Sequence, residues 1–542
     1  MPRIQLKGDG RKARAPKKTL QRLLRYLAPY KWTMALVLIC ILVTSIATVA
    51  GSKSLQYVVD DYIRPLLQME HPDFGPLFRF LCLMGVVYAA GIFTSFLYNY
   101  LMVRVAQGVQ RDIRDRLFSN MQRLPIRYFD THTHGDIMSR YTNDIDTLRQ
   151  MISQSIPQCI SSVVTIVTVF VTMLLTSPAL TGVVVVSLVG ILLATKKLTG
   201  MSGRFFVGQQ KALGAVNGYI EEMIQGQKVV KVFCHEEAAK ADFDKLNETL
   251  CTNAYRANMY SGMMGPVNNN LGYLQYVLVA VAGAWLMSRG GGIAVGALMS
   301  FLLLTRSFNQ PISQVSNQIN AIVMALAGAE RIFELMDESP EEDAGYVTLV
   351  NARRRADGSL EECPEHTGLW AWKHPHKAEG TVTYTALQGD ITMSHVDFAY
   401  EPGKPVLRDV TLYAKPGQKV AFVGATGAGK TTITNLLNRF YDIADGKIRY
   451  DNININKICK PDLRRSLGVV LQDTNLFTGT VMENIRYGNL EATDAQCIEA
   501  AKLAGAHDFI TRLPKGYETE LTGNGGSLSQ GQRQLLSIAR AA

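Results

Sequence analysis

Long runs without a charged side chain fill most of the chain before Glu330. A membrane-spanning helix needs about 20 mostly apolar residues. The runs lie between Lys31 and Lys53, Arg79 and Arg104, Arg149 and Lys196, and Arg256 and Arg289, and a last run from Gly290 to Ala329 is interrupted only by Arg306. The third run is long enough for two spans, with the turn-forming pair Ser177-Pro178 between them. The pattern predicts six membrane-spanning helices, because core helices of a soluble protein would show amphipathic alternation.

Lysine and arginine are distributed unevenly on the two sides of these spans. They are frequent in the N-terminal segment and in two long connections, 104–149 and 196–256. The connections on the other side hold only Lys53, Arg64 and Arg289. Because positive residues accumulate on the cytosolic side, we expect a multi-pass protein of a bacterial cytoplasmic (plasma) membrane, with both termini in the cytosol.

The two long connections carry a helical pattern of their own. Over 109–118, charged and apolar positions alternate at helical spacing, so we expect the spans to continue into the cytosol as long helices. Turns at 128–136 and 226–237 are candidates for contact with a cytosolic domain. The first turn contains His132 and His134, but two histidines without a third ligand favour a solvated loop over a metal site.

Polar residues within the spans indicate a water-filled path. A charge inside a span either faces a polar cavity or extends to the interface, and for Arg306 the sequence leaves both interpretations open. Pro157 and Pro311 are expected to kink their helices. Four asparagines add polarity to the fifth and sixth spans: Asn268, Asn269, Asn270 and Asn309.

The apolar pattern ends near Ser339. The stretch 340–345 is acidic and rich in helix breakers, and no long period persists up to Gly389. We therefore expect a linker, with Trp370 and Trp372 packing on the domain that follows.

The strongest motif of the chain is Gly424-Ala425-Thr426-Gly427-Ala428-Gly429-Lys430-Thr431, which fits G-x-x-x-x-G-K-[ST] in full. Residues 419–423 before it read as a buried strand, and Thr432 begins a helical run. The glycines let backbone amides turn toward phosphate oxygens, and a helix N-terminus favours an anion. Lys430 would place a charge at the outer phosphates, and the Thr431 hydroxyl would bind Mg²⁺. The motif predicts a site for ATP and Mg²⁺.

A second motif, Leu528-Ser529-Gln530-Gly531-Gln532, leads into a helical run. It resembles the L-S-G-G-Q signature of ATP-binding cassette (ABC) transporters, with Gln530 at a tolerant position. Ser529 and Gly531 at a helix start form another anion-binding end. Together with the apolar half, the chain from about Tyr26 onward resembles an exporter-type half-transporter.

Further segments resemble the same family. Phe398-Ala399-Tyr400 is similar to the loop whose aromatic ring stacks on adenine, which implies that role for Tyr400. The segment 470–473 resembles the Q-loop, and 129–140 resembles the first coupling loop of exporters. The segment 519–525 resembles the part that contacts coupling loops, although many exporters carry Glu where this chain has Gly523.

The resemblance implies a set of site residues. Lys430 and Gln472 would be catalytic, Thr431 and Gln472 would bind Mg²⁺, and 528–532 would face the ATP of a partner subunit. The family carries a catalytic Glu and a switch histidine after the signature helix, and neither is present before Ala542, so we expect the chain as given to bind nucleotide without turning it over. The implied ATP contacts are Tyr400, Gly424, Thr426, Gly427, Ala428, Gly429, Lys430, Thr431, Thr432 and Gln472.

The implied fold class is mixed. We expect a basic cytosolic segment at 1–25, a six-helix all-α transmembrane domain at 26–338, a linker at 339–389 and an incomplete α/β P-loop domain at 390–542. The whole-chain values of 47% hydrophobic and 19% charged residues are averages over an apolar first part and a more charged second part. The net charge of +10 fits a flank beside membrane lipid, so we expect no nucleic-acid partner. The eight cysteines show no paired spacing and indicate no metal cluster or disulfide framework.

The implied function is ATP-driven export of a small hydrophobic or amphipathic compound, a lipid or a peptide. Two half-transporters would pair, with a heterodimer favoured over a homodimer. Two alternatives stay open: an ATP-gated channel or regulator on the same scaffold, and a nucleotide-binding fragment that does not hydrolyse ATP. A membrane-tethered kinase is disfavoured, because it leaves 528–532 unexplained.

Overall fold

The computed structural model describes residues 16–542 except 290–292, 377–378 and 473, and divides into two compact units. The helical unit contains the described residues up to Gln122 together with His134–Glu338. The α/β unit contains Arg123–Thr133 and Ser339–Ala542. Part of the basic N-terminal segment (1–15), Gly290 of the last apolar run and Asp473 of the Q-loop-like segment lie outside the described residues.

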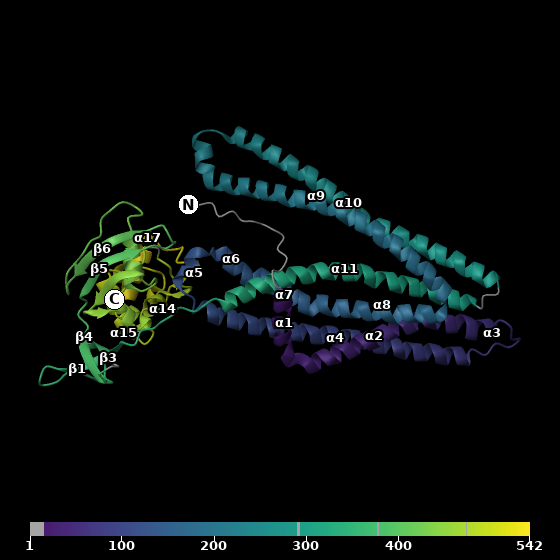
Figure 1. Ribbon diagram of the computed structural model, residues 1–542, viewed down its shortest axis with the longest axis horizontal. Coiled ribbons are helices and arrows are strands. Elements are labelled where there is room, and N and C mark those ends of the chain that lie inside the picture. The colour runs from purple at the N-terminus through teal and green to yellow at the C-terminus, as the bar shows by residue number, and fades with distance from the viewer. Residues whose placement is uncertain (1–15, 290–292, 377–378, 473) are drawn as a thin grey trace. The chain divides into compact units, whose positions relative to one another are not determined.

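The helical unit consists of long helices joined by short turns (Figure 1). Pro178 begins a new helix directly after Ser177, which confirms the turn predicted between the third and fourth spans. Three π-helical segments interrupt the helices, at Val58–Ile63, Arg140–Asp144 and Met151–Ser155. The α-helices are α1 (Pro16–Leu27), α2 (Lys31–Tyr57), α3 (Arg64–Leu66), α4 (Gly75–Met121), α6 (His134–Ser139), α7 (Ile145–Gln150), α8 (Ile156–Thr176), α9 (Pro178–Val232), α10 (Glu236–Ser288) and α11 (Val295–Asp337).

Five continuous helical stretches of the described chain are long and apolar enough to cross a membrane. They cover Lys17–Leu66, Gly75–Met121, His134–Thr176, Pro178–Val232 and Glu236–Ser288. The run predicted as the sixth span forms most of α11, a 43-residue helix. It is not among the five stretches found in the described chain, and Arg306, Asn309 and Gln310 lie within it.

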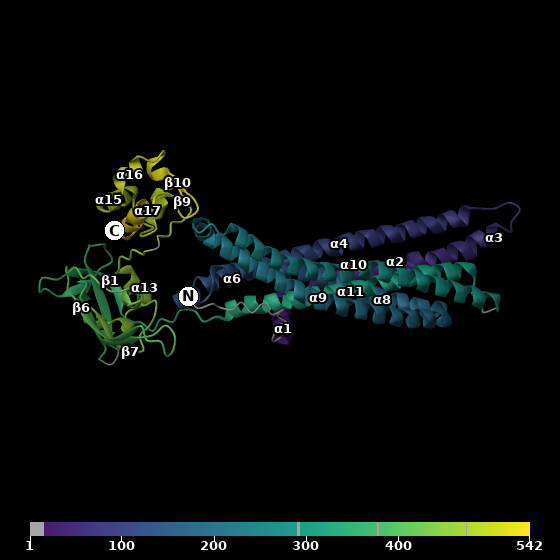
Figure 2. The same cartoon turned by 90° about the horizontal axis from the view of Figure 1, so that it is seen from above.

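Helices α9 and α10 confirm that the spans continue as long helices. They have 55 and 53 residues, or roughly 80 Å each at 1.5 Å per residue, and Figures 1 and 2 show them side by side. The predicted turn at 226–237 is a tight reversal around Cys234, which has φ of 53°. Pro311 lies inside α11, as expected, whereas Pro157 lies in the first turn of α8, where proline is tolerated.

The segment expected to be a linker forms an antiparallel four-stranded sheet. Its order is β2-β1-β3-β4. Trp372 on β3 is fully buried and lies in one hydrophobic core with residues of the second sheet, such as Met393 and Tyr450. Strands of three to seven residues with mixed burial show too little alternation to be predicted from the sequence. They are β1 (Thr348–Arg354), β2 (Leu360–Glu362), β3 (Trp370–His376) and β4 (Thr381–Ala386).

The second sheet has the order β6-β5-β7-β8 and lies next to the phosphate-binding loop in sequence. It is antiparallel throughout. One helix, α12 (Lys430–Leu437), packs Ile433 and Leu436 into its core. The strands are β5 (Ile391–Phe398), β6 (Leu407–Ala414), β7 (Asp445–Tyr450) and β8 (Ile453–Asn454), followed by α13 (Lys460–Arg465).

A second hydrophobic core forms in the last third of the α/β unit. It joins the helices that follow 476 and includes the buried Leu528 and Leu536. Figure 2 shows these helices as a group of their own next to the sheets. The elements are β9 (Gly479–Thr480), α14 (Val481–Arg486), α15 (Asp494–Leu503), α16 (His507–Thr511), β10 (Glu520–Leu521) and α17 (Gln530–Ala541).

The prediction of a buried strand at 419–423 is wrong. The segment is irregular, and no described strand pairs with it. Val423 is 94% exposed and Val420 is 44% exposed. Apolar β-branched residues favour a strand only where a neighbouring strand accepts their backbone hydrogen bonds and covers their side chains, and the described chain provides no such neighbour.

Candidate functional site

The phosphate-binding loop (424–431) turns through two glycines with left-handed backbones. Gly427 and Gly429 each have φ of 87°, a conformation that side chains disfavour. A Cβ atom at Gly429 would also lie 2.6 Å from Cδ2 of Leu407. Gly429 directly precedes α12 and is its N-cap. The motif glycines therefore let the chain turn sharply into the helix.

Lys430 closes the loop. Its Nζ donates hydrogen bonds to the carbonyl oxygens of Gly424 at 2.8 Å and Ala425 at 2.9 Å. The ammonium thus lies beside the loop backbone at the start of α12, where free amides and the helix dipole favour an anion. Thr426, Ala428 and Thr431 are exposed around it.

Tyr400 lies against the first turns of α12. Its hydroxyl donates to Oγ1 of Thr432 at 3.2 Å and accepts from Nδ2 of Asn435 at 3.2 Å. Its ring contacts Phe398 and Tyr441 edge-on, with centroid distances of 4.9 Å to each. The structure therefore brings Tyr400, Thr432 and the phosphate-binding loop together. Asn435 and Tyr441 are further neighbours that the sequence motifs do not indicate.

Tyr441 connects this cluster to a segment from the first long connection. Its hydroxyl donates to Oδ2 of Asp130 at 2.5 Å, and burial, together with this hydrogen bond and the charge of Asp130, raises the pKa of Tyr441. Asp130 lies in α5 (Ile126–Thr131), which belongs to the α/β unit. The same α5 buries Tyr128, whose ring stacks on His132 at 4.1 Å.

The histidines of that turn form no metal centre in the described chain. Nδ1 of His132 lies 2.9 Å from the carbonyl oxygen of Tyr128. No group of three or more His, Cys, Asp or Glu side chains is placed to hold a metal ion among the residues that were described.

Among the described residues, Gln472 is not part of the hydrogen-bonded cluster around the phosphate-binding loop. Its side chain is exposed in an irregular segment, and no hydrogen bond joins it to 424–432 within the described part of the chain. Gln472 is therefore assigned to the site by its resemblance to the Q-loop alone.

The signature segment lies at the start of α17. Ser529 is the N-cap: its hydroxyl accepts from the Gln532 amide at 3.3 Å, and its own amide donates to Oε1 of Gln532 at 2.9 Å. This reciprocal pair is a capping box. Leu528 is buried in the second core, whereas Gln530 and Gly531 are exposed on the first turn. The buried Leu528 therefore anchors the start of the helix, and the first turn remains accessible at Gln530 and Gly531.

The helices that follow the two motifs, α12 and α17, belong to different cores of the same unit. Helix α12 packs with the sheets, and α17 packs with α14 and α15. Before α17, Asn524 with φ of 60° accepts the Leu476 amide at 2.7 Å and shapes the 519–525 segment. Gly523 has φ of 53°, which a Glu would adopt only with strain.

The loop and its neighbours suit a magnesium–nucleotide complex. The exposed Thr431 hydroxyl offers an oxygen, the ligand type that Mg²⁺ prefers. Lys430 and the α12 amides supply positive charge and donors for phosphate. Tyr400, which hydrogen-bonds to Thr432, offers an aromatic ring beside the first turn of α12.

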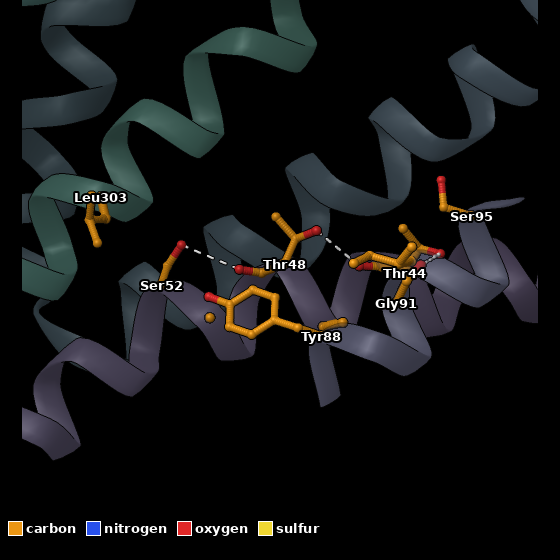
Figure 3. A pocket seen from close by; sticks show the side chains of 10 residues that line it. Thr44, Thr48, Ser52, Tyr88, Gly91, Ser95 and Leu303 are labelled. Atoms are coloured by element: carbon orange, nitrogen blue, oxygen red, sulfur yellow. Dashed lines mark hydrogen bonds between the residues drawn. The ribbon is translucent and has the colours of Figure 1, made fainter. Parts of the chain in front are cut away.

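The helical unit contains a cavity of about 490 Å³ between α2, α4 and α11. Figure 3 shows Thr44, Thr48, Ser52 and Tyr88 around it. None of the described residues that line it is charged. Its walls are neutral and rich in hydroxyls.

Polar side chains also link α9, α10 and α11. Gln275, 1% exposed, donates to the Val184 carbonyl at 3.1 Å and accepts from Asn309 at 2.6 Å. Asn268 hydrogen-bonds to Thr195 at 2.8 Å. These pairs engage two of the predicted span asparagines within the protein, although Oδ1 of Asn309 is buried without a hydrogen-bond partner among the described residues. Arg306 is exposed, and no ion pair is recorded for it among the described side chains.

Two family profiles match the chain. The profile of the ABC transporter transmembrane region matches residues 34–312, and that of the ABC transporter ATP-binding domain, described as "ABC transporter", matches 407–542. The first match covers most of the helical unit. The second includes the phosphate-binding loop and the signature segment.

Curated relatives are similar over most of the chain. An uncharacterized ABC transporter ATP-binding protein of Bacillus subtilis is 37% identical over 531 residues, which are 98% of this chain and 81% of the relative. A fatty acid ABC transporter ATP-binding/permease protein of Mycobacterium bovis is 38% identical over 86% of this chain and 69% of its own length. A probable multidrug resistance ABC transporter ATP-binding/permease protein of Bacillus subtilis is 28% identical over 91% of this chain and 68% of its own length.

Proposed function

The chain belongs to the ABC transporter family, as an exporter-type half-transporter with a membrane region followed by an ATP-binding domain, and on this premise we propose that it binds ATP with Mg²⁺ at residues 424–431 to drive export. The proposed cargo is a small hydrophobic or amphipathic compound, a lipid or a peptide. Names of relatives include a fatty acid and a multidrug resistance transporter, and both cargo types fall within this class.

The observation that carries the proposal is the geometry around α12. Lys430 lies at the loop backbone, Thr431 is exposed beside it, and Tyr400 hydrogen-bonds to Thr432 on the next position. Lys430 would hold the outer phosphates, Thr431 would bind Mg²⁺, and Tyr400 would stack on adenine. The metal ion would neutralise charge on the phosphates. Gln472 would complete the site by approaching the metal and the attacking water.

A second half-transporter would complete the working assembly. Within one α/β unit, α12 and α17 lie in separate cores. The exposed start of α17 at Gln530 and Gly531 is suited to contact phosphates bound by another subunit. We favour a different half-transporter as the partner over a second copy of this chain. Both would lie in the cytoplasmic membrane with their termini in the cytosol.

The test is equilibrium binding of a fluorescent ATP analogue to the purified chain. Lys430→Ala should weaken binding by about tenfold or more, because the charge facing the phosphates is lost. Lys415→Ala, at an exposed position of the same domain, is the matched control and should bind as the unmodified chain does. Equal affinity of the Lys430→Ala and Lys415→Ala variants would remove the assignment.

A second variant tests the base-binding side. Tyr400→Ala should weaken ATP and ADP equally, by roughly 1–3 kcal/mol, the usual contribution of base stacking. Tyr400→Phe keeps the ring and should retain most of the affinity. A loss confined to ATP would contradict the stacking role.

A further inference from the structure

Lys53 is a charged side chain of α2 at the end of the first predicted span, where the charge-free run stops. Between Lys31 and Tyr57, α2 holds no other ionisable lysine, arginine, aspartate or glutamate. Lys53 is half-buried, and its Nζ donates to the Thr176 hydroxyl at 3.0 Å. Within 4.0 Å of Nζ there is no carboxylate of a described residue. A half-buried ammonium without a carboxylate partner is costly unless an anion or water compensates its charge.

The nearest acidic group along the helix is already engaged. Asp60, two turns beyond Lys53, accepts the backbone amides of Gly296 at 2.9 Å and Ala297 at 3.0 Å. It thereby caps the start of α11, whose own N-cap residue Ala294 supplies no side-chain acceptor. The carboxylate of Asp60 therefore serves α11 and is not recorded as a partner of Lys53.

Lys53 lines a cavity of about 360 Å³ among α2, α4 and α8. Apart from Lys53, the lining is mostly apolar or aromatic. Thr168 and Thr172 also face it, but their hydroxyls donate to carbonyl oxygens of their own helix at 2.8 Å. Among the described residues that line this cavity, Lys53 is the one cationic group. The apolar and aromatic lining residues are Ile46, Val49, Ala50, Tyr57, Phe80 and Met84.

The cavity of Figure 3 provides a contrast on the other face of α2. It is lined by Thr48 and Ser52, whereas Val49 and Lys53 line the cavity described here. Successive positions of one helix therefore border a neutral hydroxyl-lined cavity and a cationic apolar cavity. The difference is chemical: only the second combines a single positive charge with a hydrocarbon wall.

We propose that the Lys53 cavity binds an amphiphile with an anionic head group and an alkyl chain. The head group pairs with the Lys53 ammonium, and the chain packs against Val49, Phe80 and Met84. The carboxylate of a free fatty acid and the phosphate of a membrane phospholipid share this chemistry, because an ammonium binds either as a point charge. The proposal rests on the proposed export function and narrows its cargo or bound lipid to acidic amphiphiles.

The experiment measures binding of radiolabelled palmitate to the purified full chain in phosphatidylcholine nanodiscs. Lys53→Met should reduce affinity for palmitate by about tenfold, and Lys53→Arg should stay within about threefold, since the charge is kept. Thr48→Val, one turn away on the other cavity, is the matched control and should bind palmitate normally. Hexadecanol, which has the same chain without the charge, should compete poorly against palmitate.

One competitor, phosphatidylglycerol, distinguishes the two possible sources of the ligand. If phosphatidylglycerol displaces palmitate, the site takes membrane phospholipid; if it does not, the site takes the free acid, and either result supports an anionic head group. Equal binding of palmitate to the Lys53→Met variant and the unmodified chain would overturn the proposal, as would hexadecanol competing as well as unlabelled palmitate.

A variant that fills the cavity distinguishes loss of the binding site from loss of the fold. Met84→Trp keeps Lys53 and occupies the apolar end of the cavity, so palmitate affinity should fall by about tenfold. Binding of the fluorescent ATP analogue is measured on every variant. Normal nucleotide binding with lost palmitate binding supports the site, and normal palmitate binding by the filled variant refutes it. Absent nucleotide binding in the unmodified chain would count against the proposed function alone.

Discussion

The Tyr441 hydroxyl donates a 2.5 Å hydrogen bond to Oδ2 of Asp130, a residue 311 positions earlier in the chain. The Tyr441 ring also lies edge-on to Tyr400 at 4.9 Å. One side chain therefore contacts both the proposed adenine-binding ring and α5, which derives from the connection between the second and third spans. This arrangement is suited to relay a movement of Tyr400 to α5.

Replacing Tyr441 by Phe should loosen α5 without preventing nucleotide binding. The substitution keeps the ring against Tyr400 but removes a hydrogen bond to a carboxylate, which contributes roughly 1.5–3 kcal/mol. Hydrogen exchange of Ile126–Thr131 should become faster, while affinity for the ATP analogue stays within about twofold. Tyr413→Phe, at an exposed tyrosine of the same unit, is the control. Unchanged exchange in α5 would show that the hydrogen bond does not hold the segment.

Trp372 should stabilise the joint core of the two sheets. It is fully buried, and its Nε1 donates to Oδ2 of Asp451 at 2.9 Å. Trp372→Phe removes that donor and part of the packed volume, which should destabilise the α/β unit by about 1–3 kcal/mol. The measurement is hydrogen exchange of β3 and β7 in the full chain. Trp370→Phe, at a half-buried position on the same strand, should have a smaller effect, and equal effects would contradict the role given to Trp372.

Glu341 should make the stability of the α/β unit depend on pH. Burial opposes its ionisation, but hydrogen bonds and charges from Arg464 and Lys460 outweigh burial and hold its pKa below the usual 4.5. A carboxyl whose pKa is depressed on folding contributes stability above about pH 4.5, and that contribution is lost as pH falls through the folded-state pKa. Thermal unfolding midpoints from pH 7 to pH 3 should therefore fall more steeply for the unmodified chain than for Glu341→Gln. Glu342→Gln, at the exposed neighbour, should follow the unmodified chain.

The proposed orientation predicts a labelling pattern. In a variant without its eight cysteines, new cysteines placed near Gly75 and near Ser177, at exposed positions, should react with an impermeant thiol reagent added outside intact cells. Cysteines at Thr133 and Gly226 should react only after the cells are opened. The reason is that lysine and arginine gather in the connections that hold the second pair. The reverse pattern would invert the topology.

Local patterns predicted local structure well. The loop at 424–431 was found because its glycines, Lys430 and Thr431 act within one turn, so their spacing alone encodes the geometry. The long helices also follow from charge-free runs and helical spacing. The break between α8 and α9 lies at Ser177-Pro178, as the sequence predicts.

Features that depend on distant partners were missed. The strands of 348–386 are short and partly exposed, so neither their alternation nor their pairing was visible, although Trp370 and Trp372 were expected to pack on the next domain. The contact between Tyr441 and Asp130 has no sequence signal, because nothing in either neighbourhood specifies the other. The strand expected at 419–423 failed for the same reason, since strand formation requires a second strand.

The irregular backbone at 419–423 has a consequence for handling the purified chain. No described strand pairs with this segment, so its peptide groups and its β-branched Val420 and Val423 are open to a strand added from another molecule. Val423, 94% exposed, gives that addition a hydrophobic contribution as well. Preparations of the chain alone should therefore self-associate at high concentration, and a short peptide designed to pair with 419–423 should keep them monodisperse. The same complementation would hold the phosphate-binding loop more rigidly from its N-terminal side.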